Sequence, residues 1–203
     1  MRNLILCLVA LFALAACGAD SIWASDADVT RATYVHDGPS AITLFTVVKT
    51  LDGAGAHSGL MINGAQRIMF DPAGSWHHPG VPERNDVHFG ISPKMVAFYT
   101  DYHARETYDV VEQTLIVSPE VAALVAQRAR EYGAVPKAQC SNSISAILRG
   151  VPGFENLGST WFPVKLMNSF ATLPGVTSRK ITDTDADNNH GVLLVQAGDP
   201  RLL

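Results

Sequence analysis

The stretch AITLFTVVKTLDGAGAHSGLMINGAQRIMF, residues 41–70, decides the fold of this 203-residue chain. It contains three apolar runs of strand length, at residues 41–49, 57–62 and 66–70. A glycine-rich turn separates the first two runs, and Asn63-Gly64, a strong hairpin signal, separates the last two. The stretch therefore predicts antiparallel strands joined by short turns.

The remainder of the chain predicts one further strand and several helices. Ser92-Pro93 and Ser118-Pro119 each combine an N-cap serine with a proline at the first helical position. The expected helices cover residues 92–105, 118–132, 140–150 and 164–173, the expected strand covers residues 108–117, and loops are expected at residues 73–90 and 182–190. The predicted fold class is α+β, with a small antiparallel sheet packed against helices.

The first 17 residues combine a positive charge, a short apolar stretch and a cysteine that follows small residues. Arg2 precedes an apolar stretch, residues 4–16, that is too short to span a bilayer, which needs roughly 20 apolar residues. Small residues then precede Cys17, and the whole pattern resembles the signal peptide and lipobox of bacterial lipoproteins. This resemblance implies that residues 1–16 are removed and that the Cys17 thiol carries diacylglycerol. Two acyl chains suffice for stable anchoring. An ordinary signal peptide with a chance cysteine, or a short membrane anchor, is the alternative.

Composition divides the rest of the chain and limits its partners. Residues 17–32 are small and polar and predict a tether, and residues 33–203 predict a single domain. Loss of Arg2 with the signal changes the net charge from −4 to −5, and no basic cluster suits nucleic acid. We expect a membrane partner through the lipid and a peptide or acyl substrate, and the sequence indicates no dedicated protein partner.

Cys140 is the one thiol that remains once Cys7 leaves with the signal and Cys17 is lipidated, so no intramolecular disulfide can form. It begins a predicted helix, where unpaired backbone N–H groups and the positive end of the helix dipole favour a thiolate. A thiolate is the competent nucleophile, and an adjacent imidazole can carry the proton. His57, at the start of a predicted strand, is the candidate imidazole. A buried structural cysteine is the alternative.

Two motifs, HSGLMING from residue 57 and CSNSISAIL from residue 140, carry a resemblance to a known group. In type and order they resemble the circularly permuted branch of the NlpC-like, papain-fold cysteine hydrolases, which includes lecithin:retinol acyltransferase-like proteins. The resemblance covers residues 57–148 and implies a permuted papain-like architecture, with His57 as base and Cys140 as nucleophile. It also implies a polar residue on the next strand that orients the imidazole. Asp71 is the candidate, and Met69 stands near where the retinol-acyltransferase relatives place a histidine.

The turn at Asn63-Gly64 decides whether Asp71 faces His57. A three-residue loop, residues 63–65, places His57 opposite Asp71 on one face of the hairpin. The two-residue turn that Asn-Gly favours pairs His57 with Phe70 and directs Asp71 to the other face. Both registers stay open at this point.

The segment after Asp71 is rich in glycine, proline and histidine. Ser75 and Trp76 are expected to rim the substrate site, unless the segment is a plain Asp-Pro turn. His77, His78 and His88 match no zinc-binding spacing, so we expect neither a metal nor a cofactor.

The resemblance implies an envelope-anchored cysteine hydrolase, an amidase or peptidase for cell-wall peptides that works through a Cys-His thioester mechanism. The alternatives are an acyltransferase or a lipid or ester hydrolase of the same fold, and a non-catalytic binding or assembly lipoprotein. Gly18 after the lipobox cysteine favours, by resemblance, the bacterial outer membrane or the periplasmic face of the envelope.

Overall fold

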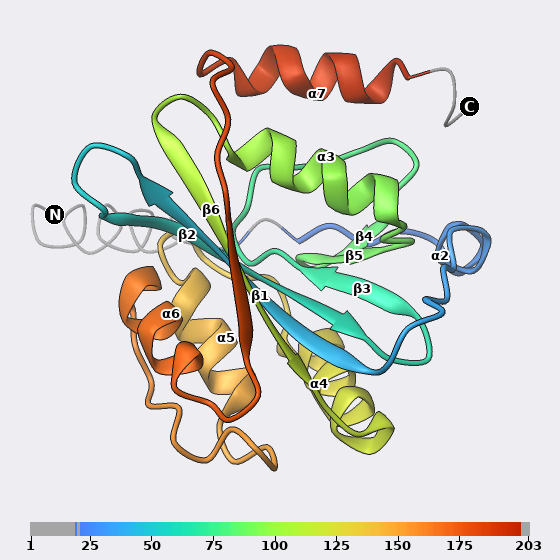
Figure 1. Cartoon of the computed structure of the whole chain (residues 1–203). Helices are drawn as coiled ribbons and strands as arrows, with labels where there is room; N and C mark the ends of the chain where they lie inside the picture. Colours follow the sequence, from blue (N-terminus) through green and yellow to red (C-terminus); the bar gives the residue numbers. More distant parts are fainter. Residues whose placement is uncertain (1–18, 20, 200–203) are drawn as a thin grey trace, which may run out of the picture.

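The computed structural model describes residue 19 and residues 21–199. The predicted signal peptide and the predicted lipidation site, Cys17, lie outside the described residues. Within them the α+β prediction is confirmed, because one antiparallel sheet lies between two layers of helices (Figure 1). No helix in this part of the chain has the length and hydrophobicity that a membrane crossing needs.

The described residues form a seven-stranded sheet in the order β4-β5-β3-β2-β1-β6-β7, and every neighbouring pair is antiparallel. The strands are β1 (Ala41–Lys49), β2 (Gly55–Asn63), β3 (Arg67–Phe70), β4 (Glu83–Arg84), β5 (Val87–Phe89), β6 (Tyr108–Ile116) and β7 (Thr177–Ile181). The four predicted strands are confirmed as β1, β2, β3 and β6. The prediction of a loop over residues 73–90 is wrong at β4 and β5, because these short strands are defined by pairing next to β3 and carry no alternating pattern of their own.

The helices pack on both faces of the sheet. They are α2 (Asp26–Arg31), α3 (Pro93–His103), α4 (Pro119–Tyr132), α5 (Cys140–Leu148), α6 (Pro163–Ala171) and α7 (Asn189–Ala197). The predicted caps of α3 and α4 are confirmed, since the Ser92 and Ser118 hydroxyls each accept a backbone N–H of their own first turn. In Figure 1, α4, α5 and α6 cover one face, and α3, with α7 packed on it, covers the other.

Two apolar cores lie on the two faces of the sheet because side chains alternate along each strand. In β1, Ile42 and Leu44 belong to the core shared with α4, α5 and α6. Phe45 and Val47 belong to the core shared with α3. The nearly continuous apolar run of β1 therefore reflects burial on both faces.

Residues 22–31 were predicted as part of a tether, and the structure corrects this. α2 begins within the segment, and Ala24 N–H donates to Glu83 C=O at 2.9 Å. Asn85 N–H donates to Ile22 C=O at 3.0 Å. The prediction was wrong because it used composition alone. The order of this segment comes from backbone hydrogen bonds to residues at β4, which are distant in the sequence.

The connection between β2 and β3 is the three-residue loop of one of the two predictions, but it covers residues 64–66 instead of 63–65. Asn63 pairs with Arg67. The same register, continued, places Asp71 opposite Gly59, so Asp71 lies diagonal to His57 on the same face of the hairpin. Neither predicted pairing of His57 is correct. His57 and Asp71 nevertheless share a face of the hairpin, as the three-residue loop predicted.

Leu60 is fully buried in the core beneath β2. Leu60→Ala is expected to lower the free energy of unfolding by about 2–5 kcal/mol, because a cavity replaces buried methyl groups. Denaturant unfolding measures this loss. Leu51→Ala, at a side chain that is 93% exposed, is the control and should change the free energy of unfolding by less than about 0.5 kcal/mol. Equal losses in the two variants would contradict the core assignment.

Candidate active site

His57 and Cys140 lie near each other beyond the point where β3 stops pairing with β2. The β2–β3 ladder reaches only to Leu60, so β3 does not pair with the start of β2, which carries His57. The hydroxyls of Ser58 and Ser141, both fully buried, lie 3.1 Å apart and join β2 to the first turn of α5. This contact holds the strand that carries His57 against the helix that begins with Cys140.

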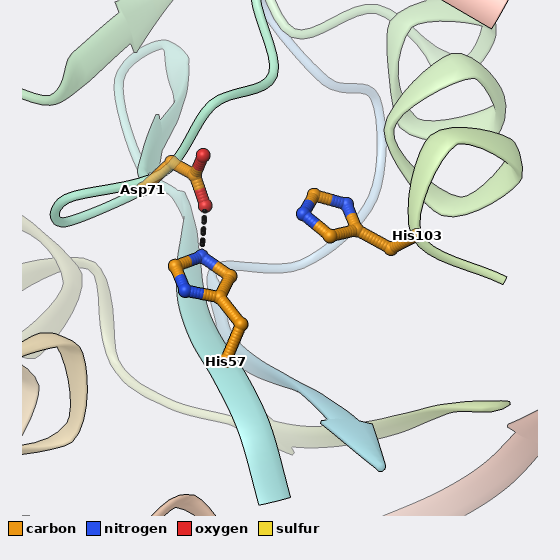
Figure 2. Close-up of side chains that lie close together, drawn as sticks. All are labelled: His57, Asp71 and His103. Carbon is orange, nitrogen blue, oxygen red and sulfur yellow. Dashed lines mark hydrogen bonds and ion pairs between the residues drawn. The ribbon is translucent and has the colours of Figure 1, made fainter. Parts of the chain in front are cut away.

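The His57 ring extends from β2 toward Asp71, which directly follows β3 (Figure 2). His57 Nε2 lies 2.7 Å from Asp71 Oδ1. Tyr99, from α3, donates its hydroxyl to the same oxygen at 2.7 Å. The Asp71 side chain is fully buried, whereas the His57 side chain is 15% exposed. Because Asp71 binds Nε2, the other ring nitrogen, Nδ1, is left for Cys140.

Gly59 makes the contact between Tyr99 and Asp71 possible. A Cβ at this position would collide with Tyr99 Oη and would lie 3.3 Å from Asp71 Oδ1. The absence of a side chain therefore leaves the space in which the hydroxyl reaches the carboxylate.

Cys140 is the first residue of α5 and is 7% exposed. Gln139, at the N-cap, makes no side-chain hydrogen bond to the helix, so the first backbone N–H groups of α5 are left for another acceptor. These groups and the helix dipole favour negative charge on the sulfur and on an oxygen held beside it.

The charges in this cluster favour a thiolate paired with an imidazolium. Burial would raise the pKa of Cys140, but a hydrogen bond and the charge of His57, together with the Ser58 backbone N–H, lower it below its ordinary value. Burial would lower the pKa of His57, but Asp71 and Cys140 raise it to about 10. Burial would also raise the pKa of Asp71, and the charge of His57 outweighs this and lowers it. All three shifts act in the same sense, towards a Cys140 thiolate beside a His57 imidazolium and an Asp71 carboxylate.

Tyr99 and His103 belong to the site and were missed by the sequence analysis. The His103 ring projects from the end of α3 toward the His57–Asp71 pair in Figure 2, and it stacks on the His57 ring with 5.5 Å between centroids. Its Nδ1–H donates to the Tyr99 carbonyl at 2.8 Å, and burial lowers its pKa to about 4, so the ring is neutral. The available signal was the spacing of these two residues, four apart on one face of a predicted helix.

Asp86 joins the two segments that carry Asp71 and Cys140. Its carboxylate accepts the Ala73 N–H at 3.3 Å and the Val135 N–H at 2.7 Å. Its backbone carbonyl accepts the Asp71 N–H at 2.8 Å. Asp86 therefore fixes the turn after β3 to the segment that leads into α5.

Two hollows flank the cluster and share residues 73–75 as a common wall. The larger has a volume of about 760 Å³ and extends to Gln139, the residue before Cys140. The smaller has a volume of about 360 Å³ and is bounded by His57 and His103. The candidate base thus bounds the smaller space, and the larger space reaches the residue before the candidate nucleophile.

The two residues predicted to rim the substrate site take different positions. Ser75 lines both hollows, and its hydroxyl lies 2.9 Å from that of Tyr102. Trp76 lines the larger hollow, but it is 2% exposed and donates its indole N–H to Gln196 at 3.2 Å. Trp76 therefore offers little surface to a ligand, and a contact of either residue with substrate stays a prediction.

His57, Asp71 and His103 place potential metal-ligand atoms within 4.8 Å of one another. His57 Nε2 and Asp71 Oδ1 are 2.7 Å apart, a distance at which they share a proton. Two ligands of one tetrahedral zinc ion would lie farther apart, at about 3.3 Å, as the usual zinc–ligand bond lengths require. The arrangement is therefore that of a hydrogen-bonded pair, and a metal would have to displace its proton.

Comparison of the chain with models of protein families, with curated proteins and with solved structures found no match. The resemblance to the permuted cysteine hydrolases therefore stays a prediction, and a function for this chain has to be proposed from the geometry of its site.

The apparent pKa for alkylation of Cys140 is expected to lie well below about 8.5, the ordinary value for a thiol. Iodoacetamide reacts with the thiolate, and His57, with its pKa raised to about 10, stays protonated and stabilises that thiolate through neutral pH. The labelling rate measured across pH should therefore reach its plateau at a lower pH than that of an ordinary thiol.

Two variants test the origin of this shift. His57→Ala should raise the apparent pKa of Cys140, because burial then acts on the thiol without an opposing cation. Asp71→Asn should raise it by less, because a neutral amide holds the imidazolium more weakly. Slow wild-type labelling that increases only near pH 8.5 would contradict the thiolate–imidazolium pair.

Gly59→Ala is expected to move the apparent pKa of Cys140 toward the ordinary value, because the new methyl group displaces Tyr99 from Asp71. Overpacking of this kind also costs about 1–3 kcal/mol of stability, which denaturant unfolding measures. Gly64→Ala in the same hairpin is the control, since its Cβ would meet only Ala122 at 3.8 Å. An unchanged alkylation profile in Gly59→Ala would show that the Tyr99–Asp71 contact does not act on the thiol.

Proposed function

We propose that this protein is an envelope-anchored cysteine hydrolase of the permuted NlpC-like, papain-like type. Cys140 is the nucleophile, His57 transfers protons, and Asp71 orients the imidazole. The observation that carries the proposal is the continuous arrangement of these three side chains, with His57 Nε2 2.7 Å from the buried Asp71 carboxylate and the thiol pKa lowered by His57. A cysteine that is merely buried in apolar surroundings has a raised pKa instead.

The first half of the reaction forms a thioester. The Cys140 thiolate attacks the substrate carbonyl carbon, and the π electrons of that carbonyl move to its oxygen. The Cys140 backbone N–H, at the uncapped start of α5, donates to this oxyanion. His57 gives its proton to the departing amine or alcohol as the bond between carbon and the leaving atom breaks.

The second half of the reaction restores the site. Neutral His57 accepts a proton from water while the water oxygen attacks the thioester carbonyl. The tetrahedral intermediate then releases a carboxylic acid, and the Cys140 thiolate returns beside the imidazolium. The neutral His103 ring stacked on His57 adds no competing positive charge during this cycle.

The two hollows suit the two halves of a substrate divided at its carbonyl. The leaving atom must lie within reach of the proton on His57, so the leaving group occupies the smaller hollow that His57 bounds. The acyl part occupies the larger hollow, which reaches Gln139, the residue before Cys140. We favour an amide bond of a cell-wall peptide, on the resemblance to a family rich in such enzymes. An acyltransferase would use the same thioester with an alcohol or amine in place of water.

An activated ester, p-nitrophenyl acetate, tests the chemistry without knowledge of the substrate. Wild-type protein should release nitrophenolate in a burst and should carry an acetyl group on Cys140, detected by mass spectrometry. His57→Ala should slow this acylation by about 10²–10⁴-fold.

Cys140→Ala should abolish the burst, and His190→Ala, at an exposed histidine on α7, should leave it unchanged. A non-catalytic binding lipoprotein would give no burst. Acetylation on a residue other than Cys140 would reject the proposed nucleophile.

A further inference from the structure

The larger hollow connects the candidate active site to the segment that follows the predicted lipid attachment point. Ala19 and Ile22 line the same groove of about 760 Å³ as Gln139, the residue before Cys140. The N-terminal segment is therefore part of the wall of a space that reaches the residue before Cys140.

Hydrogen bonds fix this segment to the domain. The Ser21 hydroxyl donates to the Asn85 side chain at 2.8 Å, and the Asn85 N–H donates to the Ile22 carbonyl at 3.0 Å. Arg84 Nε donates to the Ala24 carbonyl at 2.9 Å. The segment thus extends along the edge of β4, and the position of its start is set by the fold.

Covalent geometry then limits the distance from the groove to the lipid. Two peptide units separate Cys17 from Ala19, so their Cα atoms lie at most about 7 Å apart. A lipid on Cys17 would therefore bring Ala19, and the groove that it lines, to the surface of the bilayer.

Exposed residues of this segment, together with Arg84 of β4, have the chemistry of a membrane–water interface. Trp23 is 65% exposed and Ile22 is 49% exposed. The Arg84 guanidinium lies over the Trp23 ring, 4.9 Å from its centroid. Tryptophan places its amphipathic ring at the level of lipid headgroups. Asp26 pairs with Arg84 at 2.5 Å, so apolar contact, more than net charge, would hold this surface to a bilayer.

We propose that the N-terminal rim, formed by Ala19, Ile22, Trp23 and Arg84, rests on the membrane that holds the Cys17 lipid, so that the groove opens at the bilayer surface. The inference depends on the proposed lipoprotein anchor and extends the proposed hydrolase function. It makes the substrate a carbonyl compound that is present at the membrane surface. A tether of 16 residues, as composition predicted, would allow a wider search of the envelope than this rim does.

The exposed tryptophans provide a matched test of this orientation. The chain has three tryptophans, and Trp76 is buried. Trp161, 56% exposed, precedes α6, which lies on the side of the molecule away from α2 in Figure 1. Lipidated Trp161→Phe protein therefore reports on Trp23, and lipidated Trp23→Phe protein reports on Trp161. Both are reconstituted in phosphatidylcholine vesicles whose acyl chains carry bromine near the headgroup, which quenches tryptophan at short range.

We expect strong quenching in the Trp161→Phe protein and little in the Trp23→Phe protein. Equal quenching in both, stronger quenching of Trp161, or no quenching of either would overturn the proposed orientation. Mass spectrometry that finds no lipid on Cys17 would overturn the anchor and this inference with it. Iodoacetamide labelling of Cys140 tests the hydrolase proposal separately, so the two failures are distinguishable.

Discussion

The hydrogen bond between His57 and the buried Asp71 carboxylate is the interaction on which the rest of the site depends. Removing a carboxylate from water costs on the order of several kcal/mol unless a counter-charge compensates it. Here the compensating charge is an imidazolium, which exists at neutral pH because the carboxylate raises its pKa to about 10. The same imidazolium lowers the pKa of Cys140. The three ionisation states are therefore coupled, and the loss of either partner of the buried pair changes the state of the thiol.

The fold supplies the precision that this coupling needs. His57 lies on a strand, Cys140 at the start of a helix, and Asp71 at the end of a neighbouring strand, so regular backbone determines the position of each side chain. β3 stops pairing with β2 at Leu60, and the Ser58–Ser141 contact holds the N-terminus of α5 against the start of β2. Asp86 then links the turn after β3 to the segment that leads into α5, because it accepts backbone N–H groups from both.

The sequence predicts the parts of this structure that depend on local patterns. The long strands, the serine-capped helices and the helix that starts at Cys140 follow from apolar spacing and cap residues. Asp71 was placed as one of two possibilities, because its face depends on a hairpin register that a shift of one residue reverses. Local patterns did not predict the short strands β4 and β5 or the packed N-terminal segment, because pairing with distant residues defines them. The place of Tyr99 and His103 in the site was not predicted, because a helical pattern does not show which buried polar residue will contact a carboxylate from another strand.

The protonation state of His57 tests the central claim most directly, and nitrogen NMR of its ring measures it as a function of pH. We predict that both ring nitrogens stay protonated through the neutral range and that the ring loses its proton only near pH 10. Asp71→Asn should lower that midpoint. A wild-type ring that titrates near its ordinary pKa of about 6.5 would contradict the charged pair, and with it the thiolate that depends on it.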